Sequence, residues 1–149
     1  IMLSMYLSYQ KNIAIQSKFI NPDKHIIFTF DTIVVHQGEI KQKPENKNIA
    51  RKWLYSYIND IQEIITSYTI YISDINLFIT DFDISRVYFK EIPTEEIEKY
   101  INENPVEKWS GGIAIEKARK FFEILEGNVD SIIGVPSDKI ISTLKRLIS

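Results

Sequence analysis

The sequence contains no cysteine, and that absence excludes several kinds of chemistry. Without a thiol these residues can form no disulfide, no cysteine nucleophile and no cysteine-ligated zinc site. Only two histidines are present, His25 and His36, so a histidine-rich metal site is not expected either. A cysteine-free composition fits a cytoplasmic protein.

Long apolar runs and basic blocks are also missing. No run approaches the ~20 apolar residues that a membrane-spanning helix needs. The first residues have neither the basic region nor the small-residue cleavage site of a signal peptide. The net charge of −2 argues against a nucleic-acid binder that relies on a broad basic field. We therefore expect neither a membrane nor a nucleic acid as partner.

What is present describes an ordinary globular domain. The 149 residues are 44% hydrophobic and 26% charged, with no internal repeat and no long linker. One domain over residues 1–149 is expected. Because the chain opens on Ile1, two readings stay open: residues precede Ile1, or Met2 starts the protein.

Hydrophobic periodicity and turn residues predict an α/β protein with a mixed sheet. Helices are expected at residues 2–19, 47–57, 94–101, 113–125 and 137–148, and residues 121–126 fit a strand equally well. Strands are expected at residues 25–35, 40–42, 63–73, 76–81 and 84–91, the last three as an antiparallel meander. Asn46 and Thr94 are the predicted N-caps, and Asn21-Pro22-Asp23 is the predicted end of the first helix. The residues whose i, i+3, i+4 spacing predicts that helix are Leu3, Tyr6, Leu7, Gln10, Ile13, Ala14 and Ser17.

Asp31 interrupts the apolar run His25–Phe30, where a strand is expected to end. Aspartate is a poor strand former, and a buried carboxylate is unfavourable by several kcal/mol unless it is paired or binds a metal. Asp31 therefore has either a structural hydrogen-bond partner at a strand bend or a role in a site.

Two lysines lie where they could meet that carboxylate. Lys43 precedes Pro44 on the next loop, and Lys108 lies beside the glycine loop 110–112. Taken singly, these features also fit solvated lysines and a simple turn. Together they predict a site for a phosphate-rich ligand, in which the carboxylate holds magnesium or acts as general base.

The sequence around Asp31 resembles the Maf nucleotide pyrophosphatases. Asp31-Thr32-Ile33-Val34, Gly38-Glu39-Ile40 and Lys43-Pro44 are similar to the family signature D-T-[VI]-V…G-x-[IL]-x-x-K-P. Further matches follow in the family's order: Ala50-Arg51 through Leu54, Ser85 through Lys90, Glu95 through Tyr100, Pro105 through Lys108, and Glu126-Gly127 through Pro136.

The resemblance implies a twisted mixed sheet with flanking helices and two lobes around a cleft, related to the inosine triphosphatase fold and often dimeric. It implies hydrolysis of a nucleoside triphosphate to the monophosphate and pyrophosphate with a divalent cation, Mg²⁺ or Mn²⁺, as a house-cleaning activity. Asp31 maps onto the general base and metal-associated carboxylate, and Thr32 onto a specificity position. Lys43 and Lys108 map onto phosphate contacts, and Lys11 matches a helix lysine of the family loosely.

The sequence also departs from the family. The family's first strand and its S-x-S-P-R-R phosphate loop, followed by a metal-associated glutamate, have no counterpart in Ile1–Phe19. The family's G-R-T is Asn59-Asp60-Ile61 here, and the base-reading glutamine of G-I-Q is lost at Gly112-Ile113-Ala114. Each lost charged contact removes about 2–4 kcal/mol of transition-state stabilisation.

Three functions therefore stay open. The chain is a nucleoside triphosphate pyrophosphatase, a nucleotide-binding relative without catalysis, or an interaction module. The module would present its tyrosines as a partner surface, namely Tyr55, Tyr57, Tyr68 and Tyr71.

Overall fold

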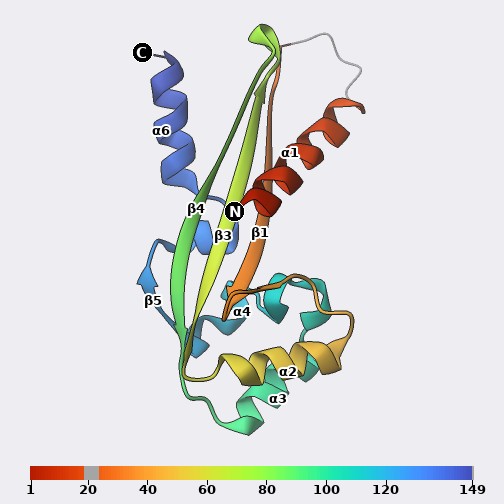
Figure 1. Cartoon of the computed structure of the whole chain (residues 1–149), viewed down its shortest axis with the longest axis vertical. Coiled ribbons are helices and arrows are strands. Elements are labelled where there is room, and N and C mark those ends of the chain that lie inside the picture. Colours follow the sequence, from red (N-terminus) through yellow and green to blue (C-terminus); the bar gives the residue numbers. More distant parts are fainter. Residues whose placement is uncertain (19–23, 149) are drawn as a thin grey trace.

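Three long antiparallel strands dominate the molecule (Figure 1). The computed structural model describes residues 1–18 and 24–148, in which five strands form one sheet of order β2-β1-β3-β4-β5. The strands are β1 (Ile26–His36), β2 (Glu39–Lys41), β3 (Asp60–Ile72), β4 (Leu77–Phe89) and β5 (Phe122–Glu126). The expected α/β class with flanking helices is confirmed. The expectation of a mixed sheet is wrong for the described strands, since every neighbouring pair is antiparallel.

Strand β4 joins two predicted strands, 76–81 and 84–91, into one. The acids predicted to break it remain in the strand because they have partners. Ser131 donates a hydrogen bond to Asp83, whose carboxylate also lies 3.6 Å from Lys139 Nζ. Asp81 accepts a hydrogen bond of 3.5 Å from the Tyr68 hydroxyl. Long-range contacts thus override the low strand propensity of aspartate.

The helices follow the predicted pattern in part. They are α1 (Met2–Gln16), α2 (Lys47–Tyr57), α3 (Thr94–Glu103), α4 (Ile115–Ala118), α5 (Val129–Ile133) and α6 (Ser137–Ile148). The Asn46 cap of α2 is confirmed, since its side chain accepts hydrogen bonds from two backbone N–H groups. The Thr94 cap is wrong, because Pro93 occupies that position. Of the long helix expected at 113–125, α4 and a 3-10 turn at Arg119–Phe121 form, and the strand alternative is realised as β5. The predicted end of the first helix, Asn21-Pro22-Asp23, lies outside the described residues.

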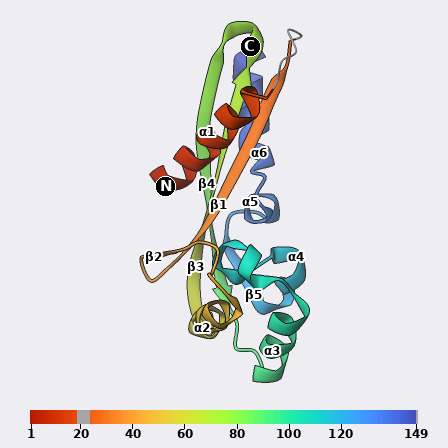
Figure 2. The same ribbon diagram turned by 90° about the vertical axis from the view of Figure 1, so that its right-hand side faces the viewer.

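The helices gather at two ends of the long strands, which gives the two-lobed shape (Figures 1 and 2). Helix α1 covers one face of the upper sheet and α6 covers the other, whereas α2 and α3 pack at the lower end. No helix among residues 1–18 and 24–148 is long and apolar enough to cross a bilayer.

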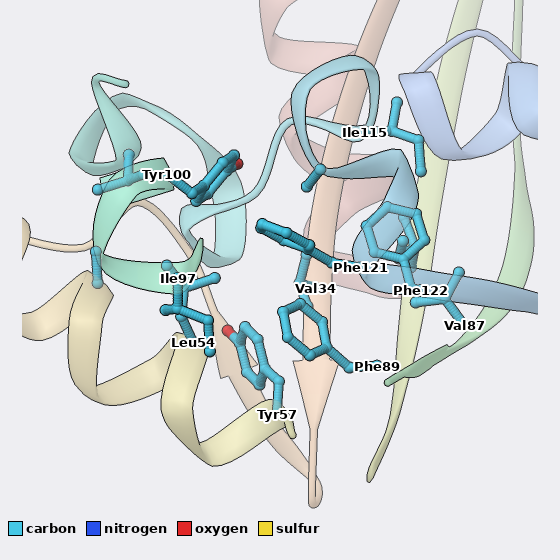
Figure 3. Packing of buried hydrophobic residues seen from close by; sticks show 14 of the residues in the cluster. Val34, Leu54, Tyr57, Val87, Phe89, Ile97, Tyr100, Ile115, Phe121 and Phe122 are labelled. Carbon is cyan, nitrogen blue, oxygen red and sulfur yellow. The ribbon is translucent and has the colours of Figure 1, made fainter. Parts of the chain in front are cut away.

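The larger apolar core lies in the lower lobe, where α2, α3 and the segment around β5 meet the sheet (Figure 3). Phe89 is fully buried there, and its ring centroid lies 5.9 Å from Tyr57 and 6.0 Å from Phe121. A smaller cluster around Tyr68, Ile70 and Ile140 attaches α6 to the upper sheet. Because Tyr57 and Tyr68 are buried, the tyrosine surface of an interaction module does not exist as predicted.

The predicted helix is confirmed as α1, but the residues it buries on the sheet are polar and are not those whose spacing predicted it. It buries Ser4, Ser8 and Asn12, while Tyr6 is 60% exposed. The Ser8 and Thr69 hydroxyls are 3.0 Å apart, and the Ser4 hydroxyl is hydrogen-bonded to that of Ser67. The strands β1 and β3 present hydroxyls on this face, so a helix with the matching polar spacing docks there.

Candidate functional site

One cavity of about 570 Å³ contains all the residues singled out in the sequence. Asp31, Thr32, Lys43 and Lys108 line it, and Lys11 joins them. The lining divides by burial. The lysines are exposed at its mouth, whereas its interior is formed by buried apolar side chains, namely Val34, Ile64, Val87, Ile115 and Phe122. Such a site can take a ligand with one strongly anionic end and one apolar end.

Asp31 lies in the middle of β1, opposite Ser67 of β3, so the strand predicted at 25–35 continues through it and the expectation that a strand ends at Asp31 is wrong. Its partner is Lys11 of α1. The Lys11 Nζ lies 2.6 Å from Asp31 Oδ1 and donates a second hydrogen bond of 2.8 Å to the Phe30 carbonyl. Asp31 is 13% exposed and Lys11 53% exposed. The carboxylate is therefore held at a fixed angle by one oxygen, and among the described residues Oδ2 has no hydrogen-bond donor.

Thr32 is held from the opposite face of β1, because neighbouring residues of a strand point to opposite faces. The Thr66 hydroxyl donates a 2.7 Å hydrogen bond to the Ser131 carbonyl. Since a hydroxyl has one hydrogen, Thr32 is the donor in the 3.0 Å bond between the Thr32 and Thr66 hydroxyls. The Thr32 oxygen therefore offers only lone pairs to a ligand.

The cavity consequently wraps around the edge of β1. The short strand β2 pairs only with Val34–His36, so the edge beside Asp31 and Thr32 has no strand neighbour among the described residues. Both side chains reach one cavity although they leave the strand on opposite sides.

Lys43 and Lys108 lie on two loops that are joined to each other. The Gly111 N–H donates a 2.9 Å hydrogen bond to the Gln42 carbonyl, and the Tyr57 hydroxyl donates one of 3.0 Å to the Gly111 carbonyl. Gly111 has φ +65°, and a Cβ there would lie 2.8 Å from a Val34 methyl group. A glycine is therefore required at position 111, where the loop that follows Lys108 crosses β1.

The mouth of the cavity carries a net positive charge. Three lysines and two acids, Asp31 and Glu116, line it, which gives a sum of +1. Neither Lys43 nor Lys108 has an ion-pair partner among the described residues. Ammonium groups without a carboxylate partner suit the oxygens of a phosphate chain.

A metal ion bound by the chain alone does not fit these residues. No group of three or more histidine, aspartate or glutamate side chains converges within the described part of the chain. Asp31 already pairs with Lys11. Magnesium that arrives with a polyphosphate needs only one or two protein carboxylates, so Asp31 and Glu116 could contact such an ion.

The sequence interpretation missed three polar residues of this cavity, Gln62, Ser110 and Glu116. The Ser110 hydroxyl donates a 2.8 Å hydrogen bond to the Thr32 carbonyl, which fixes the glycine loop against β1. Gln62 is completely buried on β3. It lies one residue before the strand predicted at 63–73, so the sequence pattern gave no signal for it.

Asp60, which the sequence comparison matches to the arginine of the family's G-R-T, does not line the cavity. Hydrogen bonds from Gln37, from the Ile61 N–H and from His36 lower the pKa of its carboxyl group. The His36 Nε2 and Asp60 Oδ2 are 2.9 Å apart. Asp60 therefore stabilises the turn between β1 and β2.

Comparison with known proteins gives one consistent result. A family model described as Maf-like protein matches residues 2–147. A 7-methyl-GTP pyrophosphatase of Dictyostelium discoideum is 32% identical over 113 residues, which cover 76% of this chain and 57% of that protein. A dTTP/UTP pyrophosphatase of Geotalea uraniireducens is 33% identical over 119 residues, covering 78% of this chain and 61% of that protein. Another dTTP/UTP pyrophosphatase, of Clostridium botulinum (strain Kyoto / Type A2), is 29% identical over 145 residues, which cover 96% of this chain and 74% of that protein. The chain thus spans about three fifths of the length of the first two relatives.

Proposed function

This chain belongs to the Maf-like protein family, and we propose that it hydrolyses a nucleoside triphosphate to the monophosphate and pyrophosphate. The observation that carries the proposal is the meeting of Asp31 with three lysines at the mouth of one cavity with an apolar interior. The names of the relatives, dTTP/UTP and 7-methyl-GTP pyrophosphatases, agree with it. In this proposal residues 1–149 form a single Maf-like domain.

In the proposed reaction Asp31 accepts a proton from water through Oδ2. The water oxygen bonds to the α-phosphorus, the bridge between the α- and β-phosphates breaks, and pyrophosphate leaves with the bridging oxygen. Lys11 keeps the carboxylate in place through Oδ1. Lys43 and Lys108 offset the charge that develops on the phosphate oxygens. Thr32 accepts a hydrogen bond from the substrate and contributes to its selection.

A divalent cation, Mg²⁺ or Mn²⁺, is part of the proposal and arrives with the triphosphate. It would neutralise phosphate oxygens, and Asp31 would be the carboxylate that contacts it. Cytoplasmic location and assembly into a homodimer are proposals that the family resemblance supports.

The test is the conversion of Asp31 to asparagine. Asp31→Asn keeps the size of the side chain but cannot take the proton from water, so pyrophosphate release should fall about 10²–10⁴-fold. Lys11 is half exposed, so water can solvate its ammonium group when the carboxylate is lost, and folding should be preserved. The matched control is Asp74→Asn. It removes a carboxylate that lies 2.7 Å from Lys24 Nζ and does not line the cavity. Unchanged turnover in Asp31→Asn would refute the assigned role.

A second candidate is nucleotide binding without catalysis. It is favoured by one observation, the 2.6 Å contact between Lys11 Nζ and Asp31 Oδ1, which occupies one oxygen of the proposed base. A panel of nucleoside triphosphates with Mg²⁺ or Mn²⁺ separates the two candidates. Binding without pyrophosphate release would support the second, and steady release from any nucleotide would exclude it.

A further inference from the structure

Gln62 is a polar residue in the apolar interior of the cavity. It is 0% exposed, and it pairs across the sheet with His36 on β1 and Val87 on β4. Its neighbours in the cavity lining include Ile64, Val87 and Phe122, all of them buried. A polar side chain at this depth requires a hydrogen-bond partner for each of its polar atoms.

The surroundings fix which end of the amide is nitrogen. The Gln62 Nε2 lies 3.3 Å from the Tyr57 carbonyl oxygen and 3.2 Å from the Asp60 carbonyl oxygen. Because carbonyl oxygens only accept hydrogen bonds, the NH₂ group must face them and both of its hydrogens are used. The opposite orientation would place three oxygens together without a donor.

The oxygen of the same amide is left without a donor. Gln62 Oε1 is buried and has no hydrogen-bond partner among the described residues. The apolar residues that share the cavity interior with it have no side-chain donor to offer. Because Gln62 lines the cavity, a molecule bound there that presents a hydrogen-bond donor would satisfy this oxygen.

We propose that Gln62 reads the base of the nucleotide, with Oε1 accepting a hydrogen bond from an N–H group on the edge of the base. The inference rests on the proposed function for the kind of ligand. Buried aliphatic and aromatic side chains enclose the base, while Lys11, Lys43 and Lys108 hold its phosphates at the mouth. Because both amide hydrogens are committed, Gln62 selects for a donor and against an edge that lacks one.

The test measures the binding of nucleoside monophosphates by calorimetry, which does not depend on turnover. UMP, CMP, AMP and GMP are titrated into the protein, and the tightest binder is compared with its analogue methylated on the edge nitrogen that donates. Removing the donor should weaken binding about tenfold or more, since a site built around a hydrogen bond rejects a ligand that cannot make it.

Variants separate the lost hydrogen bond from the added bulk of the methyl group. In Gln62→Leu the acceptor is gone, so the penalty for methylation should shrink to about twofold or threefold. Ile64→Val, a change in the same lining that leaves Gln62 intact, should keep the full penalty. Gln62→Met is the substitute if loss of the two carbonyl partners prevents Gln62→Leu from folding.

Equal penalties in the parent and the leucine variant, or no penalty at all, would overturn the inference. So would hydrolysis of triphosphates by a protein that binds none of the four monophosphates, although the proposed function would then stand. A protein that neither binds nor hydrolyses any nucleotide would overturn both.

Discussion

At the scale of single residues, the three lysines of the cavity differ in how they are held. Lys11 is fixed by two hydrogen bonds, to Asp31 and to the Phe30 carbonyl. Lys43 and Lys108 have no carboxylate partner in the described part of the chain, and their side chains are exposed. Lys11 therefore positions the carboxylate, whereas the other two are available to an anion.

Replacement of Lys43 by alanine should separate these roles. In Lys43→Ala the substrate phosphates lose one charged contact, so kcat/KM should fall about 10²–10³-fold. The fold should be unaffected because Lys43 contributes no ion pair. The control is Lys52→Ala, which removes an exposed lysine of α2 outside the cavity lining. A similar loss in both variants would point to general electrostatic attraction instead of a phosphate contact.

At the scale of elements, polar contacts between helix α1 and the sheet fix the position of Lys11, which α1 carries. The Asn12 Nδ2 donates to the carbonyl oxygens of Ile27 and Thr69, at 3.1 and 3.2 Å. Thr29 donates a 2.7 Å hydrogen bond to the Ser8 carbonyl. Hydrogen bonds depend on direction more than apolar contacts do, so this arrangement fixes the rotation of α1 and with it the place of Lys11.

Asn12→Ala should therefore affect both stability and activity. Two buried carbonyl groups lose a donor, so the free energy of unfolding should fall by about 1–3 kcal/mol. Urea unfolding measures this loss, and kcat should fall along with it as Lys11 loses its register. Gln10→Ala, an exposed position two residues away on the same helix, should change stability by less than about 0.5 kcal/mol. A stable Asn12→Ala variant would show that α1 is held in another way.

At the scale of the whole molecule, the larger core sets the response to alkaline pH. Tyr100 is buried in that core, and desolvation raises the pKa of its hydroxyl to about 12. Burial likewise raises the pKa of Tyr57. These hydroxyls keep their protons to a higher pH in the folded chain than in the unfolded chain. Their contribution to stability is therefore complete only below the pKa of the unfolded chain.

Stability should accordingly fall as the pH rises from about 10 to 12, because the unfolded state binds fewer protons there. For Tyr100 alone the loss approaches about 2–3 kcal/mol at the upper end of this window. Thermal or urea unfolding as a function of pH measures the loss. In Tyr100→Phe the decline should be shallower than in the parent protein, and parallel profiles would contradict this origin.

Sequence reasoning succeeded where local pattern and tertiary structure agree. Helix α2 has a strong amphipathic pattern and a side-chain cap, and its bounds were predicted as the structure has them. It failed where distant partners decide. Asp83 stays in a strand because Ser131 and Lys139 bind it. Helix α1 buries Ser4 and Ser8 because the sheet offers hydroxyls, and no periodicity of apolar residues reports that.

The candidate site shows the same division. The grouping of Asp31, Thr32, Lys43 and Lys108 in one cavity was predicted from motif order, whereas their roles stay predictions. Gln62 could not be singled out in advance, because its significance depends on two carbonyl groups that occupy its amide hydrogens. Such a constraint exists only once the chain has folded.

The polar contact of α1 has a consequence for temperature. Exposing apolar surface raises the heat capacity, whereas exposing polar surface lowers it. The detachment of α1 exposes hydroxyl, amide and carbonyl groups together with the Tyr9 ring that contacts Phe78, so its heat-capacity change should be smaller than that of the phenylalanine-rich core. Apolar cohesion weakens in the cold. The alignment of Lys11 with Asp31 should thus persist on cooling, at temperatures where the lobe that carries Lys43 and Lys108 is already losing its rigidity.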